Sequence, residues 1–329
     1  MMRIFLLILL MSGLPIAQAE ATQRPQKSWV QDWPDTDFSK TNIKFGEIIS
    51  GGVPKDGIPA IDNPIFEPVS AVTNLGAFEP VISLQIAGEA RAYPLRILMY
   101  HEIVNDQIAD VPFSVTYCPL CNTSIVFERT LNGVVLDFGT TGKLRKSDMV
   151  MYDRQSESWW QQFTGLGLVG HYTGILLDRI PSRIESIAQF ALRHPNGQVL
   201  VPNNPAARPY GNNPYVGYDS SKTPFLYGKY NGTLPALSRV VAVESDAWPL
   251  ELLRQEKQIS YGDLLLTWTA GQNSALDSRQ IRKGKDVGNV VVQRINADGI
   301  KSDVIYHLPF AFAFSAFQPD GTLHLKIDE

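Results

Sequence analysis

The only two cysteines of the 329-residue chain, Cys118 and Cys121, stand two residues apart in the stretch VTYCPLCNTS. A Cys-Pro-x-Cys turn that leads into a β run has the form of a metal knuckle, in which two thiolates converge on one ion. In an oxidising compartment, two thiols this close also tend to close into a disulfide. The pair therefore predicts a metal site or a redox or structural disulfide, with two inert thiols as the third alternative.

A metal site on this pair needs further ligands, because the second cysteine pair of a zinc ribbon is missing. His101 and Glu102 lie just upstream of the cysteines, and His307 is a more distant candidate. We expect His101 to be the leading third ligand. Thiolate with imidazole suits copper at least as well as zinc, since soft sulfur ligands favour Cu(I). The sequence therefore predicts a copper or zinc ion as the cofactor.

A thiol–disulfide enzyme is the competing prediction for the same pair. Catalysts of that kind usually place the first cysteine at the start of a helix, whose dipole lowers the thiol pKa. The residues that follow the pair, 123–127 (TSIVF), are typical of a strand instead. This pattern weakens the prediction of an oxidoreductase and leaves a structural disulfide open.

A second polar segment, DMVMYDR, alternates polar and apolar residues over 148–154. In a strand, Asp148 would share one face with Tyr152 and Arg154. Arg154 is explained either by a structural salt bridge with Asp153 or by a clamp on an anionic substrate. The candidate catalytic residues are Cys118, Cys121, Tyr117, Asp148 and Arg154.

Several familiar catalytic motifs are missing from the sequence. It contains no GxGxxG, no Walker loop, no GxSxG and no HExxH, because His101-Glu102 is followed by Ile-Val-Asn. Hydrolase and nucleotide-binding functions therefore lack support, and the sequence leaves open whether the protein is an enzyme.

The N-terminal stretch MMRIFLLILLMSGLPIAQAE has the form of a secretory signal peptide, with a small-x-small cleavage site at Ala17-Gln18-Ala19. Its apolar run is too short to span a hydrocarbon core of about 30 Å. We expect cleavage near Ala19 and a periplasmic or secreted protein that does not span the membrane. The formal net charge of -4 argues against a nucleic-acid partner.

Alternating apolar runs around short turns predict a mainly β protein of the α+β class. Hairpins are expected over 81–95, 123–139 and 148–163, the second with a type I′ turn at Asn132-Gly133. Helices are expected over 94–99 and over 182–194, the latter with Ser182 as the N-cap and Glu185 as its capping-box partner.

An internal repeat predicts two related lobes. VISLQIAGEARAYPLRIL at 81–98 resembles VVAVESDAWPLELL at 240–253, and VTYCPLCNT at 115–123 aligns with LTWTAGQNS at 266–274. The second lobe has Thr269 and Gln272 where the first has cysteines. The expected organisation is a signal peptide at 1–19, an irregular segment at 20–78, the first lobe at 79–201, a Pro/Asn/Tyr-rich connecting loop at 202–239 and a degenerate second lobe at 240–329.

Several segments in order, HEIVND (101–106), VTYCPLCNTS, LDFGTTGKL (136–144) and DMVMYDRQSESWWQQ (148–162), resemble the bacterial domain-of-unknown-function family 3179. GQNSALDSR (271–279) and FAFAFSAFQP (310–319) are similar to its C-terminal part. The chain departs from many members by having Asn122 after the second cysteine, where glycine is common. The family name implies no activity.

The sequence therefore supports three hypotheses. The first is an exported protein with a small metal site on Cys118 and Cys121, in metal handling or metal-dependent redox chemistry. The second is a thiol–disulfide oxidoreductase that uses the same pair. The third is a ligand-binding module in which the pair is a structural disulfide and the segment 202–235 contacts the ligand. The partner is accordingly an unknown small ligand or a metal-exchange partner.

Overall fold

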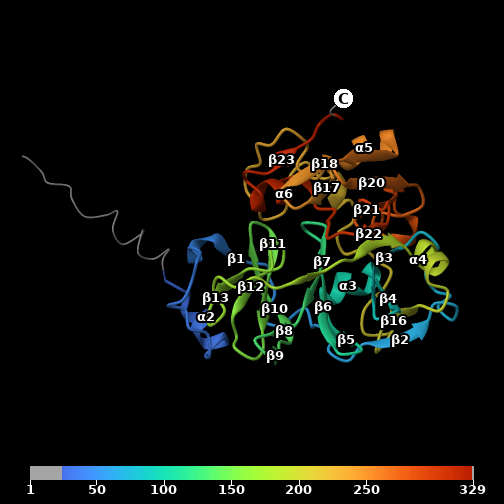
Figure 1. Cartoon of the computed structure of the whole chain (residues 1–329). Helices are drawn as coiled ribbons and strands as arrows, with labels where there is room; N and C mark the ends of the chain where they lie inside the picture. Colours follow the sequence, from blue (N-terminus) through green and yellow to red (C-terminus); the bar gives the residue numbers. More distant parts are fainter. Residues whose placement is uncertain (1–23, 328–329) are drawn as a thin grey trace, which may run out of the picture.

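The computed structural model describes residues 24–327, and it confirms the predicted β-rich class, with several small sheets and only short helices. Figure 1 shows the sheets packed into two bodies, with the C-terminal part of the chain above the rest. The predicted signal peptide lies outside the described residues. Among the described residues, no helix has both the length and the apolar character needed to cross a bilayer.

The first lobe contains two sheets joined by a helix. One sheet has the strand order β15-β3-β4-β16-β2 and the other has the order β14-β7-β6-β5. The helix α3 (Leu95–His101) connects β4 to β5. The strands are β2 (Ile65–Pro68), β3 (Pro80–Ile86), β4 (Glu89–Pro94), β5 (Ile103–Ile108), β6 (Val111–Cys118), β7 (Thr123–Glu128), β14 (Arg179–Ile180), β15 (Arg183–Ser186) and β16 (Gln198–Val201).

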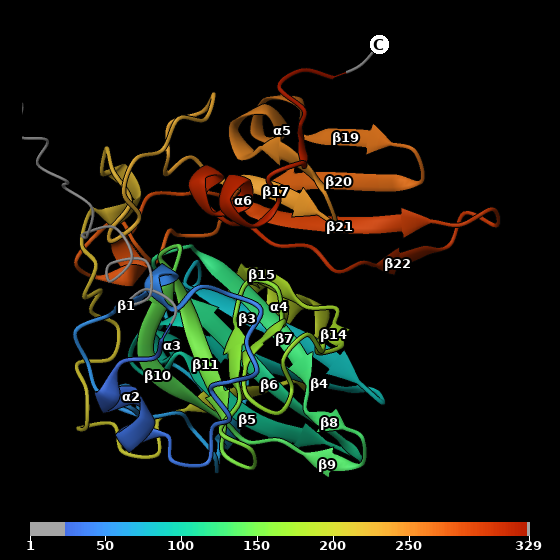
Figure 2. The same ribbon diagram turned by 90° about the vertical axis from the view of Figure 1, so that its left-hand side faces the viewer.

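The second lobe repeats this plan with fewer strands. Its sheets have the orders β17-β18-β23 and β19-β20-β21-β22, and α5 (Leu250–Glu256) connects them as α3 does in the first lobe. The strands are β17 (Val240–Val243), β18 (Asp246–Pro249), β19 (Gln258–Tyr261), β20 (Leu264–Thr269), β21 (Asn289–Ile295), β22 (Lys301–Asp303) and β23 (Thr322–Leu323). Figure 2 shows this lobe lying across the top of the first.

Equivalent backbone hydrogen bonds show that the two lobes share one backbone arrangement at this point. The amide of Tyr117 donates to the carbonyl of Glu102 at 2.8 Å, and the amide of Trp268 donates to that of Lys257 at 2.9 Å. Glu102 and Lys257 are the left-handed C-caps of α3 and α5, with φ of 57° and 65°. The repeated sequence segments therefore encode the same hairpin–helix–hairpin geometry twice.

The equivalence extends to a second helix in each lobe. The first residue of α4 (Ile187–Arg193) donates its amide to the carbonyl of Glu79, and the first residue of α6 (Ala311–Phe317) donates to that of Ser238. Each helix is followed by a strand, β16 or β23, that pairs in parallel with β4 or β18. This part of the duplication was not predicted, because the two helix sequences share little beyond aromatic residues.

The first lobe also contains an insertion between β7 and β14 that has no counterpart in the second. It forms most of a five-stranded sheet of order β1-β10-β11-β12-β13 and a small β8-β9 hairpin. Its strands are β1 (Ile48–Ser50), β8 (Thr130–Leu131), β9 (Val134–Val135), β10 (Phe138–Arg145), β11 (Asp148–Asp153), β12 (Trp159–Gln161) and β13 (Gly167–Val169). β1 joins it from the N-terminal segment.

The expected hairpins are largely correct. β3 pairs with β4, β11 pairs with β12, and the turn at Asn132-Gly133 has φ of 51° and 79°, as a type I′ turn requires. That turn joins β8 to β9, however, and β7 pairs with β6 and β14. The expected helix over 94–99 corresponds to α3.

The expected start of the later helix is wrong. Arg183–Ser186 form the strand β15, which pairs with β3, and the helix begins only at Ile187. Ser186, not Ser182, is the N-cap, and its Oγ accepts from the amide of Gln189 at 3.3 Å. The apolar spacing could not separate a short buried strand from the first turn of a helix.

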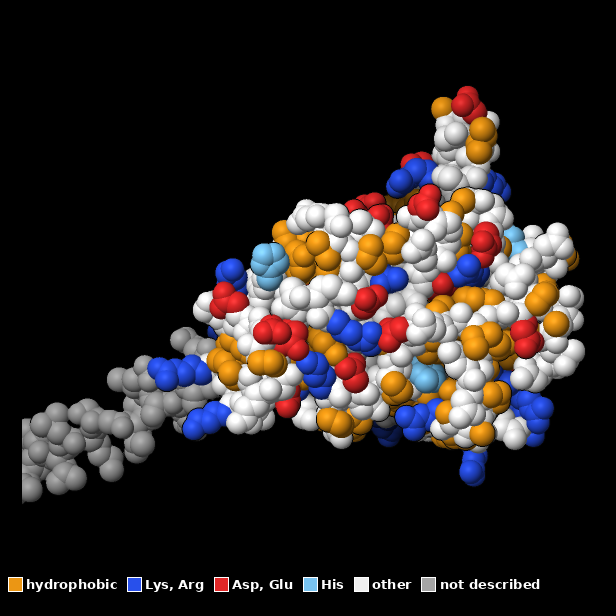
Figure 3. All heavy atoms as spheres, turned by 90° about the horizontal axis from the view of Figure 1, so that it is seen from below, with side chains coloured by type: hydrophobic (Ala, Val, Ile, Leu, Met, Phe, Trp, Pro, Cys, Tyr) orange, Lys and Arg blue, Asp and Glu red, His pale blue; other side chains and the backbone are white. Residues whose placement is uncertain are grey.

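The N-terminal segment is irregular between short elements, α2 (Lys27–Asp32) and the 3-10 turn η1 (Phe45–Glu47). Trp29 and Trp33 of this segment pack on Trp159 of β12, with ring centroids 5.3 and 5.1 Å apart. The connecting segment 202–239 carries one 3-10 turn, η2 (Tyr218–Ser220). On the face seen in Figure 3, acidic and basic side chains are interspersed with apolar ones.

Candidate metal centre

The two cysteines lie on the tight turn between β6 and β7. Cys118 is the last residue of β6 and is the register partner of Thr123, the first residue of β7. Asn122 completes the turn in the left-handed region, with φ of 53°, which asparagine tolerates better than most residues. Both thiols are free, with exposed fractions of 2% for Cys118 and 0% for Cys121.

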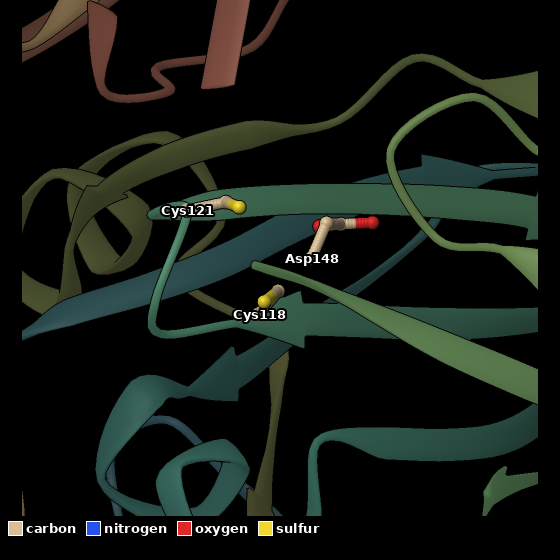
Figure 4. A group of neighbouring side chains, drawn as sticks. All are labelled: Cys118, Cys121 and Asp148. Atoms are coloured by element: carbon tan, nitrogen blue, oxygen red, sulfur yellow. The ribbon is translucent and has the colours of Figure 1, made fainter. Parts of the chain in front are cut away.

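Asp148 approaches this turn from the inserted sheet, where it is the first residue of β11. One ligand atom from each of Cys118, Cys121 and Asp148 lies within 4.8 Å of the other two. Figure 4 shows the three side chains gathered around one space. Within residues 24–327 this is the only such group of three potential metal ligands.

The Asp148 carboxylate is held in place by two strong donors on one oxygen. Its Oδ2 accepts from Gln161 Nε2 at 2.7 Å and from the amide of Phe163 at 2.8 Å. Oδ1 makes a longer contact of 3.5 Å with Thr123 Oγ1. One oxygen therefore fixes the orientation of the carboxylate, and the other keeps capacity for a ligand.

A backbone carbonyl completes the surroundings of the thiols. Ser147 O accepts from Cys121 Sγ at 3.5 Å and lies 4.0 Å from Cys118 Sγ. Lys146 and Ser147 form the two-residue turn between β10 and β11, and both have positive φ, 53° and 66°. The hairpin tip is anchored outside its own sheet, because Lys146 Nζ donates to Ala316 O of α6 at 2.7 Å.

Burial makes ionisation of all three side chains unfavourable. It raises the pKa of Cys118, and it raises the pKa of Cys121 well above its usual value, with the Cys118 thiol adding to the effect. Burial also raises the pKa of Asp148 to about 6, although hydrogen bonds from Gln161 and Phe163 oppose this. A nucleophilic redox thiol needs the opposite shift. The electrostatics therefore suit a bound cation better than a reactive thiolate.

Glu102 lies beside this group without belonging to it. It is buried, with 8% of its surface exposed, and burial together with the charge of Asp148 raises its pKa to about 8. The left-handed C-cap position directs the chain sharply from α3 into β5. Of the three additional metal ligands predicted from the sequence, Glu102 is the one that the structure brings within electrostatic range of the cysteines.

The structure does not bring His101 to the cysteines, which corrects the expected ligand set. Its Nδ1 lies 2.8 Å from Pro59 O and its Nε2 lies 2.8 Å from the Tyr210 hydroxyl. Both ring nitrogens are thus engaged with groups away from the thiols. His101 and Glu102 are neighbours in sequence, but the reversal of the chain at the end of α3 separates their surroundings.

His307 is also absent from the group. Its ring packs against Phe163 with centroids 5.6 Å apart, and its Nε2 lies 3.4 Å from Arg179 Nη1. Burial, together with the nearby Arg179 charge, lowers the pKa of His307 to about 3, so the imidazole is neutral. It is a core histidine of the interface between the lobes.

The remaining candidates have structural contacts. The Tyr117 hydroxyl lies 3.3 Å from Asn122 Oδ1, so Tyr117 supports the cysteine turn from within the core. Arg154 pairs with Asp62 at 2.8 Å rather than with Asp153. It follows the far end of β11, about 20 Å from Asp148 at about 3.3 Å per residue. Arg154 therefore does not share a site with the cysteines.

The sequence pointed to Asp148 as a catalytic residue and missed it as a partner of the thiols. It also missed the Ser147 carbonyl. The available signal was Asp148 itself, which is followed by three apolar residues and Tyr152, since a buried aspartate at a strand end needs a compensating partner. The register that brings β11 to the β6–β7 turn is set by the inserted sheet, which the sequence did not reveal.

No curated protein and no solved structure was found to match this chain. One protein family does match, over residues 55–321, which include most of both lobes and of the inserted sheet, and the whole cysteine turn. The expectation drawn from the Tyr-Cys-Pro-x-Cys and Met-Tyr-Asp-Arg segments is thus confirmed. The chain belongs to the family described as "Protein of unknown function (DUF3179)".

Proposed function

We propose that Cys118, Cys121 and Asp148 bind one transition-metal ion, and that the protein handles this ion or uses it in redox chemistry. The observation that carries the proposal is the convergence of three potential ligand atoms within 4.8 Å in a fully buried place. Without a cation, burial keeps the two thiols protonated and makes ionisation of Asp148 less favourable. A divalent ion would let all three ionise together, with the release of protons.

The donor set favours zinc over copper. Two thiolates and one carboxylate are all ordinary zinc ligands, and three protein ligands leave a fourth position for water, a substrate or a further protein group. Cu(I) prefers sulfur and imidazole. The case for copper rested on His101, whose ring nitrogens bond elsewhere. Zinc is therefore the proposed ion, and copper is the alternative that the experiment must include.

The proposed location is the periplasm or the extracellular space, after cleavage of the signal peptide near Ala19. The support is the n-region, apolar run and small-x-small site of the sequence. In that compartment a buried ion would also protect the thiols from closing into a disulfide. A metal-exchange partner is the corresponding interaction for a handling role.

Elemental analysis of protein purified without a polyhistidine tag tests the metal site. We expect about one zinc ion per chain in the wild type, and its loss in the Cys118→Ser/Cys121→Ser double variant. Asp148→Asn should weaken binding by at least about tenfold, because the amide keeps an acceptor oxygen but loses the ligand charge. Asp298→Asn, in an exposed turn, is the matched control.

The proposal fails if the folded wild type takes up neither zinc nor copper from a buffered solution after reduction. It also fails if the double variant and Asp148→Asn bind as tightly as the wild type. Metal uptake measured with a chromogenic chelator gives the affinities, and a pH electrode detects the proton release.

A second candidate function, thiol–disulfide exchange, is favoured by the closeness of the two free thiols. The raised pKa values of Cys118 and Cys121 argue against rapid nucleophilic attack by either thiol. Titration of the thiols in glutathione buffers separates the two functions. A potential near that of known thiol–disulfide catalysts would support exchange, whereas a pair that stays reduced only while metal is bound would support the metal site.

A further inference from the structure

A pocket of about 120 Å³ lies against the outer side of the cysteine turn. It extends from the exposed residues Gly51 and Phe225 to the buried residues Glu102 and Met149. Leu120, which stands between the two cysteines, forms part of the wall. The pocket therefore leads from the surface to the immediate neighbourhood of the proposed metal centre without being lined by its three ligands.

The walls of this pocket are mostly apolar. Val53, Ile58, Leu120, Leu144, Met149 and Phe225 contribute hydrophobic side chains. Lys143 also lines the pocket, but its ammonium group lies 4.3 Å from the centre of the Trp33 ring, among the indoles of the N-terminal segment. Thr140 uses its hydroxyl to donate to Ile58 O at 2.8 Å. These groups offer an occupant little beyond apolar contact.

Two polar side chains of the pocket have no partner in the described part of the chain. The Glu102 carboxyl and the Tyr215 hydroxyl each line the pocket, and neither makes a side-chain hydrogen bond within residues 24–327. Both side chains line the same pocket. Glu102 as a residue has only 8% of its surface exposed, and a carboxyl in such a place without a protein partner costs free energy that ordinary packing would not require.

The equivalent position in the second lobe shows that the fold does not need an acid there. Lys257 occupies the same left-handed C-cap and makes the same backbone hydrogen bond, yet its side chain lies over Trp268 at 4.1 Å from the ring centre. The turn therefore does not require an acid at position 102, and the place of Glu102 in the pocket wall is the better explanation of the acidic side chain. A buried acid without a partner raises the free energy of the folded state, and such groups are characteristic of ligand sites.

We propose that this pocket binds a small uncharged carbonyl compound, whose oxygen accepts hydrogen bonds from the Glu102 carboxyl and the Tyr215 hydroxyl. The Glu102 side chain is buried and forms no ion pair among residues 24–327, and burial of an unpaired carboxyl favours its protonated form, which presents an O–H. A neutral carboxyl and a phenol together are a suitable pair of donors for a carbonyl oxygen. The apolar walls then contact the rest of the molecule.

The pocket volume limits the ligand to roughly four to seven non-hydrogen atoms, because a cavity of about 150 Å³ holds benzene. This inference extends beyond the proposed metal site and does not depend on it, since none of the three metal ligands lines the pocket.

Titration of metal-free protein with cyclopentanone, followed by NMR of ¹³C-labelled methionine methyl groups, tests the proposal. Met149 lines the pocket and reports binding directly. We expect saturable shifts of its signal at millimolar ketone. Cyclopentane, which has the same shape without the oxygen, should bind at least about fivefold more weakly, because it lacks the hydrogen bonds.

Different substitutions test the contribution of the hydrogen bonds and that of the pocket volume. Glu102→Gln keeps a donor and should bind cyclopentanone within about threefold of the wild type, whereas Glu102→Leu should lose about tenfold. Tyr215→Phe should lose a few-fold, and Leu144→Phe should block the pocket. Glu251→Gln, at an exposed position on α5, is the matched control. Circular dichroism establishes that each variant is folded, and Tyr215→Phe carries the test if Glu102→Leu is not.

Three outcomes would overturn the proposal: no saturable shift at Met149, equal binding of ketone and cyclopentane, or preferential binding of methylammonium. The last would mean that Glu102 is ionised and that the pocket takes a cation. The Cys118→Ser/Cys121→Ser variant should bind cyclopentanone as the wild type does. A failure of the metal proposal is therefore distinguishable from a failure of this one.

Discussion

At the scale of single residues, the centre is defined by burial as much as by donor type. Two thiols and a carboxylate are common in proteins, but here all three are excluded from water and share one space. In the proposed metal site, a bound cation would replace the protons that these side chains otherwise keep. His101 has an ideal ligand chemistry and no role in the centre, because its nitrogens are already bonded to Pro59 and Tyr210.

The raised pKa of Glu102 predicts how the free energy of unfolding depends on pH. Its pKa is about 8 in the folded protein and is normally 4.5, so the folded state holds a proton that the unfolded state has lost between these values. The free energy of unfolding should therefore fall as pH rises through this window. Between pH 6, where Asp148 is half ionised, and pH 8, the loss should be about 2 kcal/mol in metal-free protein.

Urea denaturation of the wild type and Glu102→Gln at both pH values measures this loss. The variant should be the less pH-dependent protein by about that amount, since its amide does not titrate. Equal pH dependence of the two proteins would show that Glu102 is not held protonated. Glu251→Gln again serves as the control, because its carboxyl is exposed.

At the scale of elements, the β10–β11 hairpin is what makes the first lobe different from the second. The chain has a similar backbone path after β6 in the first lobe and after β20 in the second. Only the first lobe has an inserted sheet, which brings Asp148 to the β6–β7 turn. The cysteines and the hairpin therefore form one unit. The second lobe has neither part and has Thr269 and Gln272 at the cysteine positions.

The corrected start of α4 gives a stability prediction. Ser186→Ala removes the side-chain acceptor for the amide of Gln189 and should lower the free energy of unfolding by about 1 kcal/mol. Ser182→Ala should change it by less than about 0.5 kcal/mol, because Ser182 precedes a strand and caps no helix. Thermal or urea unfolding of the two variants compares them directly, and a larger effect at Ser182 would contradict the observed boundary.

The elements show which parts of the fold could be predicted from the sequence. Hairpins with clear alternation and the Asn132-Gly133 turn were predictable, because they depend on local spacing and on left-handed backbone propensity. The strand Arg183–Ser186 was not, since four residues of mixed character fit a helix equally well. The meeting of Cys121 with Asp148 depends on long-range register, which no local pattern encodes.

At the scale of the whole molecule, the cysteine turn is also a junction between the lobes. Asn122 Nδ2 donates to Leu308 O at 2.7 Å, and the amide of Phe310 donates to Cys121 O at 3.0 Å. The connecting segment closes the same region, because the Tyr218 hydroxyl donates to Leu120 O at 3.1 Å. The sequence predicted the two lobes from their repeat but gave no sign that they would meet at the thiols.

This junction leads to a prediction for the complete chain. Because the site touches both lobes, zinc should stabilise them together, by about 2.7 kcal/mol at a free concentration of one hundred times the dissociation constant. Calorimetry should show a single unfolding transition that moves to higher temperature with zinc in the wild type and not in Cys118→Ser/Cys121→Ser. Two transitions, of which only one responds, would show that the lobes unfold independently of each other.

The Lys143 side chain links the pocket to a cluster of three indoles. It lines the pocket, and its ammonium group lies 4.3 Å from the centre of the Trp33 ring, 5.6 Å from that of Trp29 and 5.7 Å from that of Trp159. A positive charge so near the face of an indole alters the energy of its excited state. An occupant of the pocket that displaces Lys143 should therefore change the wavelength or intensity of tryptophan fluorescence, so that binding could be followed without an added label.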